Sequence, residues 1–123
     1  MKKSAKLEQK IDKLGLQFIQ RHIFICADRN KCKCACAEQM EASWKFLKSR
    51  LKALGLNGRG GVARSRTQCL GVCCEGPIVV VYPEGTWYGG CDENVLEKII
   101  QRHLRRGEVV EEHVIAHSRA LNT

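Results

Sequence analysis

The sequence predicts one α/β domain, a small mixed β-sheet flanked by helices, with a helical extension at its N-terminus. Its 123 residues suit a single hydrophobic core. Helical patterns alternate with short β-prone runs, an order typical of a mixed sheet covered by helices. The strongest strand signal, at residues 78–82, is followed by a turn at 83–85 and a second run at 86–88, which together predict a β-hairpin.

The extension, residues 1–20, is predicted to form an amphipathic helix. Its apolar residues Leu7, Ile11, Leu14 and Phe18 share one helical face, and lysines fill the other face. We expect this helix to rest on its own domain. Docking to a partner or to a membrane is the alternative.

The other elements follow in chain order. Residues 22–25 form a β-prone run that ends at Cys26, and residues 38–54 repeat apolar positions at helical spacing up to a capping Gly55. Residues 62–67 predict an exposed strand. Asp92 can cap a last helix, whose apolar positions continue to Leu104 and which ends at Gly107. The chain therefore divides into the extension at 1–20, a domain at 21–110 and a C-terminal tail at 111–123, to which no element is assigned.

The charge balance bears on partners and location. The net charge is +8 at pH 7, from 21 Lys and Arg against 13 Asp and Glu. Such a surface attracts nucleic acid, anionic lipid or acidic proteins, and charge alone does not choose among them. No apolar run is long enough to span a bilayer, and the start of the chain does not have the pattern of a secretory signal. A cytoplasmic protein without a transmembrane segment is the expectation.

The eight cysteines indicate a metal site. No two of them have the C-x-x-C spacing, which disfavours a zinc ribbon and a thiol oxidoreductase. Cys26 follows a predicted strand, and Cys69 and Cys73 bracket a loop containing Gly71 just before another strand. Two neighbouring loops at one end of a sheet could then supply four thiolates, which suit an iron–sulfur cluster or a structural zinc.

The order of several motifs resembles a known family. The motifs are residues 22–26, the Cys-x-x-x-Cys segment at 69–73, Gly-Pro with a strand and Tyr-Pro at 76–83, Gly-Thr-Trp-Tyr at 85–88, and the helix leading into residues 103–107. Together they resemble the thioredoxin-like [2Fe–2S] ferredoxins, which are similar to the cluster-bearing domain of a respiratory complex I subunit. The resemblance implies a thioredoxin-like fold and a [2Fe–2S] cluster with Cys26, Cys69 and Cys73 among its ligands.

The second ligand of the family lies just before the first helix, where Cys32, Cys34 and Cys36 alternate in this sequence. Counting back from Trp44 leaves both Cys34 and Cys36 open. We select Cys34, because the loop then matches the shorter form of the family loop without a gap. The predicted ligand set is Cys26, Cys34, Cys69 and Cys73. Cys91 is expected to be a small core residue.

These features predict a one-electron carrier, not an enzyme. The alternative is a structural or redox-sensing module that holds iron–sulfur or zinc and uses its basic surface to bind a partner or nucleic acid. Arg59, Arg64 and Arg66 precede Cys69 and would face an acidic redox protein if they are exposed. Nucleic acid ranks behind such a partner, and a homodimer is left open.

Overall fold

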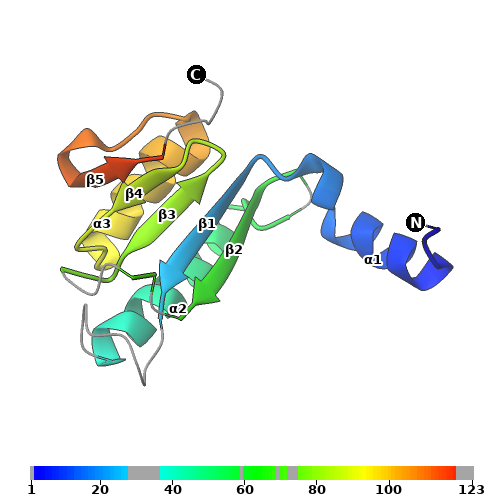
Figure 1. Cartoon of the computed structure of the whole chain (residues 1–123), viewed down its shortest axis with the longest axis horizontal. Coiled ribbons are helices and arrows are strands. Elements are labelled where there is room, and N and C mark those ends of the chain that lie inside the picture. Colours follow the sequence, from blue (N-terminus) through cyan, green and yellow to red (C-terminus); the bar gives the residue numbers. More distant parts are fainter. Residues whose placement is uncertain (1, 28–36, 59, 69, 72–74, 119–123) are drawn as a thin grey trace.

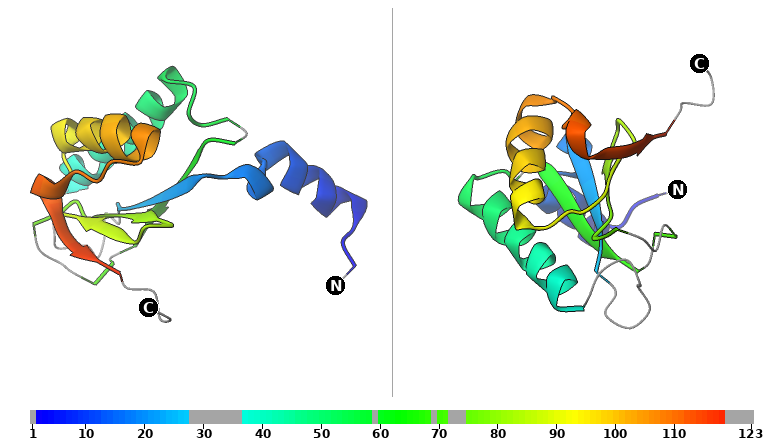
Figure 2. Two further views of the ribbon diagram at one scale, coloured as in Figure 1. Left: turned by 90° about the horizontal axis from the view of Figure 1, so that it is seen from above. Right: turned by 90° about the vertical axis from the view of Figure 1, so that its left-hand side faces the viewer.

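A five-stranded sheet with its long helices on one face forms the body of the protein (Figures 1 and 2). The computed structural model describes residues 2–27, 37–58, 60–68, 70–71 and 75–118. The strands are β1 (Arg21–Cys26), β2 (Val62–Thr67), β3 (Val79–Tyr82), β4 (Thr86–Tyr88) and β5 (Val114–His117), in the order β2-β1-β3-β4-β5. β1 and β2 are parallel, and the other pairs are antiparallel. The predicted mixed sheet is confirmed.

The hydrophobic core lies between the sheet and the helices α2 (Ala37–Ala53) and α3 (Glu93–Lys98). Alternate residues of a strand point to opposite faces, so one set from each central strand faces the helices. The residues of the central strands that pack in this core are fully buried, and they are Ile23, Ile25, Val79 and Val81.

Local signals set the helix ends. α2 stops where Gly55 adopts a left-handed φ of 69°. The Gly55 N–H donates to Lys52 O, and the Leu56 N–H donates to Leu51 O, which is the Schellman pattern. At the start of α3, the Asp92 carboxylate accepts from the Val95 N–H at 3.0 Å. Both predicted caps are confirmed.

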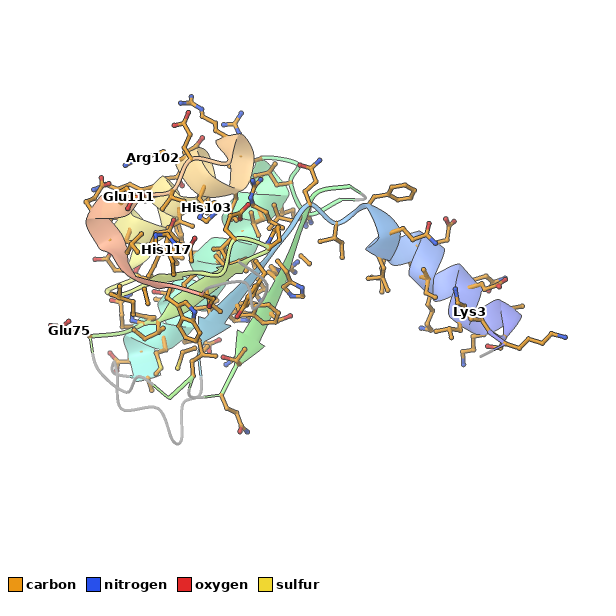
Figure 3. The ribbon with its side chains drawn as sticks, turned by 45° about the horizontal axis from the view of Figure 1, so that its top comes forward. Lys3, Glu75, Arg102, His103, Glu111 and His117 are labelled. Atoms are coloured by element: carbon orange, nitrogen blue, oxygen red, sulfur yellow. The ribbon has the colours of Figure 1, made fainter. Side chains whose placement is uncertain are left out.

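The last helix differs from the expectation in its second half. The sequence predicts one helix that Asp92 caps and Gly107 ends, whereas α3 gives way to π-helix over Ile99–Leu104. This wider turn carries His103, which is fully buried and labelled in Figure 3.

A buried chain of hydrogen bonds runs through His103. The Val110 N–H donates to the Tyr88 hydroxyl at 3.1 Å, and that hydroxyl lies 2.7 Å from His103 Nδ1. His103 Nε2 is 3.0 Å from Glu84, whose carboxylate also accepts two hydrogen bonds from Arg21. Because the Val110 N–H can only donate, the direction of every hydrogen bond in the series is fixed when His103 is neutral. Tyr88 donates to Nδ1, and Nε2–H donates to Glu84.

β5 lies in the segment where the sequence predicts no element. It follows a short 3₁₀ turn at Glu111–His113 and pairs antiparallel with β4. This part of the predicted tail therefore belongs to the sheet.

The N-terminal extension is helical, but it does not rest on the domain. α1 (Ala5–Leu14) ends where Gly15 takes a left-handed φ of 64°, and a 3₁₀ turn follows at Leu16–Phe18. The helix points away from the body (Figure 1), and Leu14 is 63% exposed. The expectation of a packed helix is thus wrong, because the turn at Gly15 directs the chain into β1 without folding α1 back. None of the helices in the described ranges is long and apolar enough to cross a membrane.

Candidate metal centre

The predicted metal site maps to one end of the sheet. In the parallel pair the register runs from Arg21 opposite Val62 to Cys26 opposite Thr67, so β1 and β2 finish at the same end. The segment 28–36 follows Ala27, and Cys69 follows Gln68. The described residues that flank both cysteine-bearing segments therefore meet at this end, as the sequence predicts (Figure 1).

Cys26 is the one predicted ligand that the structure describes. It is the last residue of β1 and is 1% exposed, and its N–H donates to Ile78 O at 3.0 Å. Cys34, Cys69 and Cys73 lie outside the described residues, as does the alternative Cys36. The complete ligand set therefore stays a prediction.

Apolar side chains surround Cys26. Met40 of α2 and Ile78 are buried with it, and Leu70 and Trp87 pack against them while partly exposed. Trp87 is thus a packing residue. A cysteine thiolate is a soft ligand of the kind that iron–sulfur clusters use, and apolar neighbours limit the access of solvent to such a site. The donor chemistry at Cys26 therefore fits an iron–sulfur centre.

A positive charge lies next to Cys26 in the chain. Arg66 Nη2 donates to Ala27 O at 3.0 Å and contacts a Glu41 carboxylate oxygen at 3.3 Å. The Arg66 side chain is 42% exposed, so the charge is partly screened by water. This contact joins residues 39 positions apart and left no signal in the sequence.

Arg66 belongs to a group of cations around one aromatic ring. Lys48 Nζ lies 5.3 Å from the Trp44 ring centroid, and the guanidinium carbons of Arg64 and Arg66 lie 6.0 and 5.7 Å from it. We call Lys48, Arg64 and Arg66 the basic patch. Its members neighbour a ring that is itself 8% exposed, a favourable arrangement for cations.

The expected row of exposed arginines is confirmed only for Arg66. Arg64 is half-buried, and its Nε has no hydrogen-bond partner among the described residues. Residues 62, 64 and 66 share the face of β2 that packs toward α2, and Arg66, nearer the end of the strand, is the more exposed of the two arginines. Arg59 lies outside the described residues.

Gly71 meets a backbone requirement near the site. Its φ of 95° lies in the left-handed region, which side chains other than glycine rarely adopt. A Cβ built there would meet none of the described residues within 4 Å, so the backbone conformation accounts for the glycine. This glycine falls between the two cysteines of the Cys-x-x-x-Cys segment.

Cys91 is a core residue, as expected. It is fully buried, and its Sγ lies 3.7 Å from Gly89 O. Burial, with a smaller contribution from Asp92, raises the pKa of the Cys91 thiol and keeps it protonated. Among the described residues, no group of three His, Cys, Asp or Glu side chains could hold a metal ion.

The chain is similar to known iron–sulfur proteins. It is 35% identical over 96 residues to a 2Fe-2S ferredoxin of Clostridium pasteurianum, which covers 74% of this chain and 91% of that protein. It is 33% identical over 101 residues to a putative 2Fe-2S ferredoxin of Priestia megaterium, across 82% of this chain and 74% of the relative. No protein-family model matches the chain.

Solved structures agree with these relatives. A thioredoxin-like [2Fe-2S] ferredoxin from Aquifex aeolicus superposes with a TM-score of 0.69 at 26% identity, covering 85% of this chain and 98% of that one. A crystal structure of the wild-type Aquifex ferredoxin gives a TM-score of 0.65 at 28% identity, covering 80% and 98% of the two chains.

Proposed function

Because the chain belongs to the [2Fe–2S] ferredoxins of thioredoxin-like fold, which are electron carriers, we propose that its cluster is held by the thiolates of Cys26, Cys34, Cys69 and Cys73. A [2Fe–2S] cluster bound there takes up and returns one electron. The single observation that carries the proposal is the position of Cys26, buried at the end of β1 where both cysteine-bearing segments depart.

The described residues around Cys26 supply what an electron carrier needs. Met40, Ile78 and Trp87 pack around Cys26, the first proposed ligand along the sequence, and keep water from it. Arg66 places a positive charge beside the peptide that follows this ligand, where it offsets negative charge at the site. We propose an electron carrier that catalyses no reaction of its own and acts in the cytoplasm.

The ligand proposal is tested by single alanine substitutions at Cys26, Cys69 and Cys73. Each variant should lose the visible absorption of the cluster and the matching iron and sulfide, because each removes one of four thiolates. Cys91→Ala is the matched control and should keep both, because its buried neutral thiol serves only packing. Normal iron content in Cys69→Ala would contradict the assignment. A colourless protein that contains zinc would favour the structural alternative.

The choice between Cys34 and Cys36 needs a second set of variants. Either single alanine variant can be rescued by the neighbouring cysteine after a small shift of the segment. The double variant should therefore assemble far less cluster than either single variant, as judged by iron per chain. A stable cluster in the double variant would show that Cys32 or a non-cysteine group is the ligand.

We propose further that an acidic redox protein docks on the basic patch. Arg66 contacts Ala27 O, next to Cys26, and Lys48 lies over the same Trp44 ring as Arg66. Attraction at this patch would therefore bring an acidic partner toward the cluster. The half-buried Arg64 serves mainly to fill the space beside Trp44.

Charge reversal tests this docking face. Lys48→Glu should slow electron exchange with an acidic flavoprotein or ferredoxin severalfold at low salt, and the difference should shrink at high salt as screening grows. Lys98→Glu, at an exposed lysine of α3, is the matched control and should leave the rate closer to that of the wild type. Equal rates for the wild type and Lys48→Glu at low salt would place the docking face elsewhere.

A further inference from the structure

The N-terminal helix presents apolar side chains to water. Leu7, Leu14 and Leu16 are 36%, 63% and 49% exposed, although leucine is among the residues most often buried. Leu7, Ile11 and Leu14 recur at spacings of four and three, so they form one stripe along α1. A stripe of this kind is an interaction surface and not a scatter of single residues.

The helix is built to stand apart from the domain. The Ser4 hydroxyl accepts from the Leu7 N–H at its start, and the Gly15 N–H donates to the last turn at its end. Caps alone rarely stabilise a helix of 10 residues in water, so α1 gains most from a surface that covers its leucines.

Charge identifies the kind of surface. Residues 2–14 contain five lysines and two acidic residues, a net charge of 5 − 2 = +3, and all five lysines are exposed. On a helical projection, Lys6, Lys10 and Lys13 lie on one side of the apolar stripe, and Glu8 and Asp12 lie on the other. Leucines beside lysines with long flexible stems are the composition of helices that lie in the interface of an anionic bilayer.

The shape of the molecule suits this arrangement. Figure 3 shows Lys3 at the far tip of the extension, and Glu75, which precedes Gly76 and β3, at the opposite end of the molecule. The end of the sheet that carries Cys26 is likewise remote from α1 (Figure 1). A surface that binds α1 would thus leave the end with Cys26 accessible to a redox partner.

We propose that α1, with the turn at Leu16, binds the surface of an anionic lipid bilayer by burying its leucines among the acyl chains and placing its lysines at the headgroups. The helix lies on the membrane and does not cross it, since 10 residues span about half of a hydrocarbon core. This attachment does not depend on which cysteines bind the cluster.

The test is co-sedimentation of the purified full-length holoprotein with vesicles. We expect binding to vesicles of phosphatidylcholine with phosphatidylglycerol, at least about tenfold tighter than to phosphatidylcholine alone, weakening with salt. Binding should also raise the helical signal in far-UV circular dichroism, because the bilayer stabilises α1.

Two double variants separate the contributions of apolar contact and charge. Leu7→Ser with Leu14→Ser should weaken binding at least about tenfold, because both side chains leave the interface. Lys6→Gln with Lys10→Gln should weaken it about 25-fold, at about fivefold for each lysine near the surface. Both should keep the visible spectrum of the wild type, which shows that the domain still folds.

Matched controls lie on the body of the protein. Ile115→Ser removes an apolar side chain that is 48% exposed on β5, and Lys45→Gln with Lys52→Gln removes two exposed charges from α2. Neither control should change binding more than about twofold. An equal loss in the controls would overturn the assignment to α1.

Other partners that could cover the apolar stripe of α1 give different results. If the wild type does not sediment with anionic vesicles, the proposal is wrong. If the leucine variants instead convert a dimer to a monomer in sedimentation velocity without lipid, the occupant is a second copy of the chain. If they slow electron exchange with an acidic protein in lipid-free solution and vesicles are not bound, the occupant is that protein.

Discussion

Removing the Tyr88 hydroxyl should lower the free energy of unfolding by more than the loss of one hydrogen bond, because two buried groups lose their partner. Tyr88 is fully buried, and its hydroxyl accepts from the Val110 N–H while it bonds His103 Nδ1. In Tyr88→Phe both of those groups stay buried and lose a partner. The ring keeps its contacts, so the change isolates the polar contribution.

The magnitude follows from the two groups left unsatisfied. A buried donor or acceptor without a partner costs about 1–3 kcal/mol, so we expect the free energy of unfolding to fall by about 3 kcal/mol in total. For a chain of 123 residues this corresponds to a decrease in Tm of about 10 °C. A water molecule that entered the site would bond the two groups and reduce the loss of free energy of unfolding toward about 1 kcal/mol.

The assay is urea and thermal unfolding of the holoprotein, followed by far-UV circular dichroism. Tyr82→Phe is the matched control, because it makes the same chemical change at a ring that is 41% exposed, and it should stay within about 0.5 kcal/mol of the wild type. If Tyr88→Phe also unfolds within about 0.5 kcal/mol of the wild type, the hydrogen-bond chain adds nothing to ring packing and the reasoning fails.

Two further predictions concern charge. Burial lowers the pKa of His103, partly offset by its carboxylate partner, so the unfolded state binds a proton before the folded state does. Stability should therefore be full above about pH 6.5 and fall as the pH drops below it, with a slope approaching 1.4 kcal/mol per pH unit, about the limit for one group. In urea titrations His103→Gln should reduce this slope between about pH 6.5 and pH 5.5, where His22, whose pKa burial also lowers, still contributes. Arg66→Gln should lower the reduction potential, measured by dye-mediated titration, by on the order of tens of millivolts, because it removes a positive charge beside Ala27. Arg50→Gln, which removes the same charge near the other end of α2, should shift the potential less; equal shifts would refute a local effect.

Elements defined by neighbouring residues were predictable from the sequence. Residues 62–67 alternate clearly and form β2 with the predicted bounds, and Gly55 and Asp92 cap their helices where expected. β5 was missed because its four residues become a strand by pairing with β4, which lies more than 20 positions earlier. A local pattern does not contain that information.

The site shows the same limit. Cys26 could be found because a cysteine at the end of a buried strand is visible in the sequence. The contact of Arg66 with Ala27 O depends on the parallel pairing of β1 with β2, and the contact of His103 with Tyr88 depends on how the last helix packs on the sheet. The apolar stripe of α1 was visible, but nothing in its periodicity says whether the domain covers it.

The position of β2 has a consequence for solubility. β2 is an edge strand, and an edge strand offers backbone N–H and C=O groups to any other extended chain. The second part of β2 carries Arg64 and Arg66. If the β2 strands of two molecules paired, these positive charges would lie close to one another. The arginines that lie beside Trp44 therefore also oppose edge-to-edge aggregation, and replacing them with β-branched apolar residues would leave the sheet open to growth from that side.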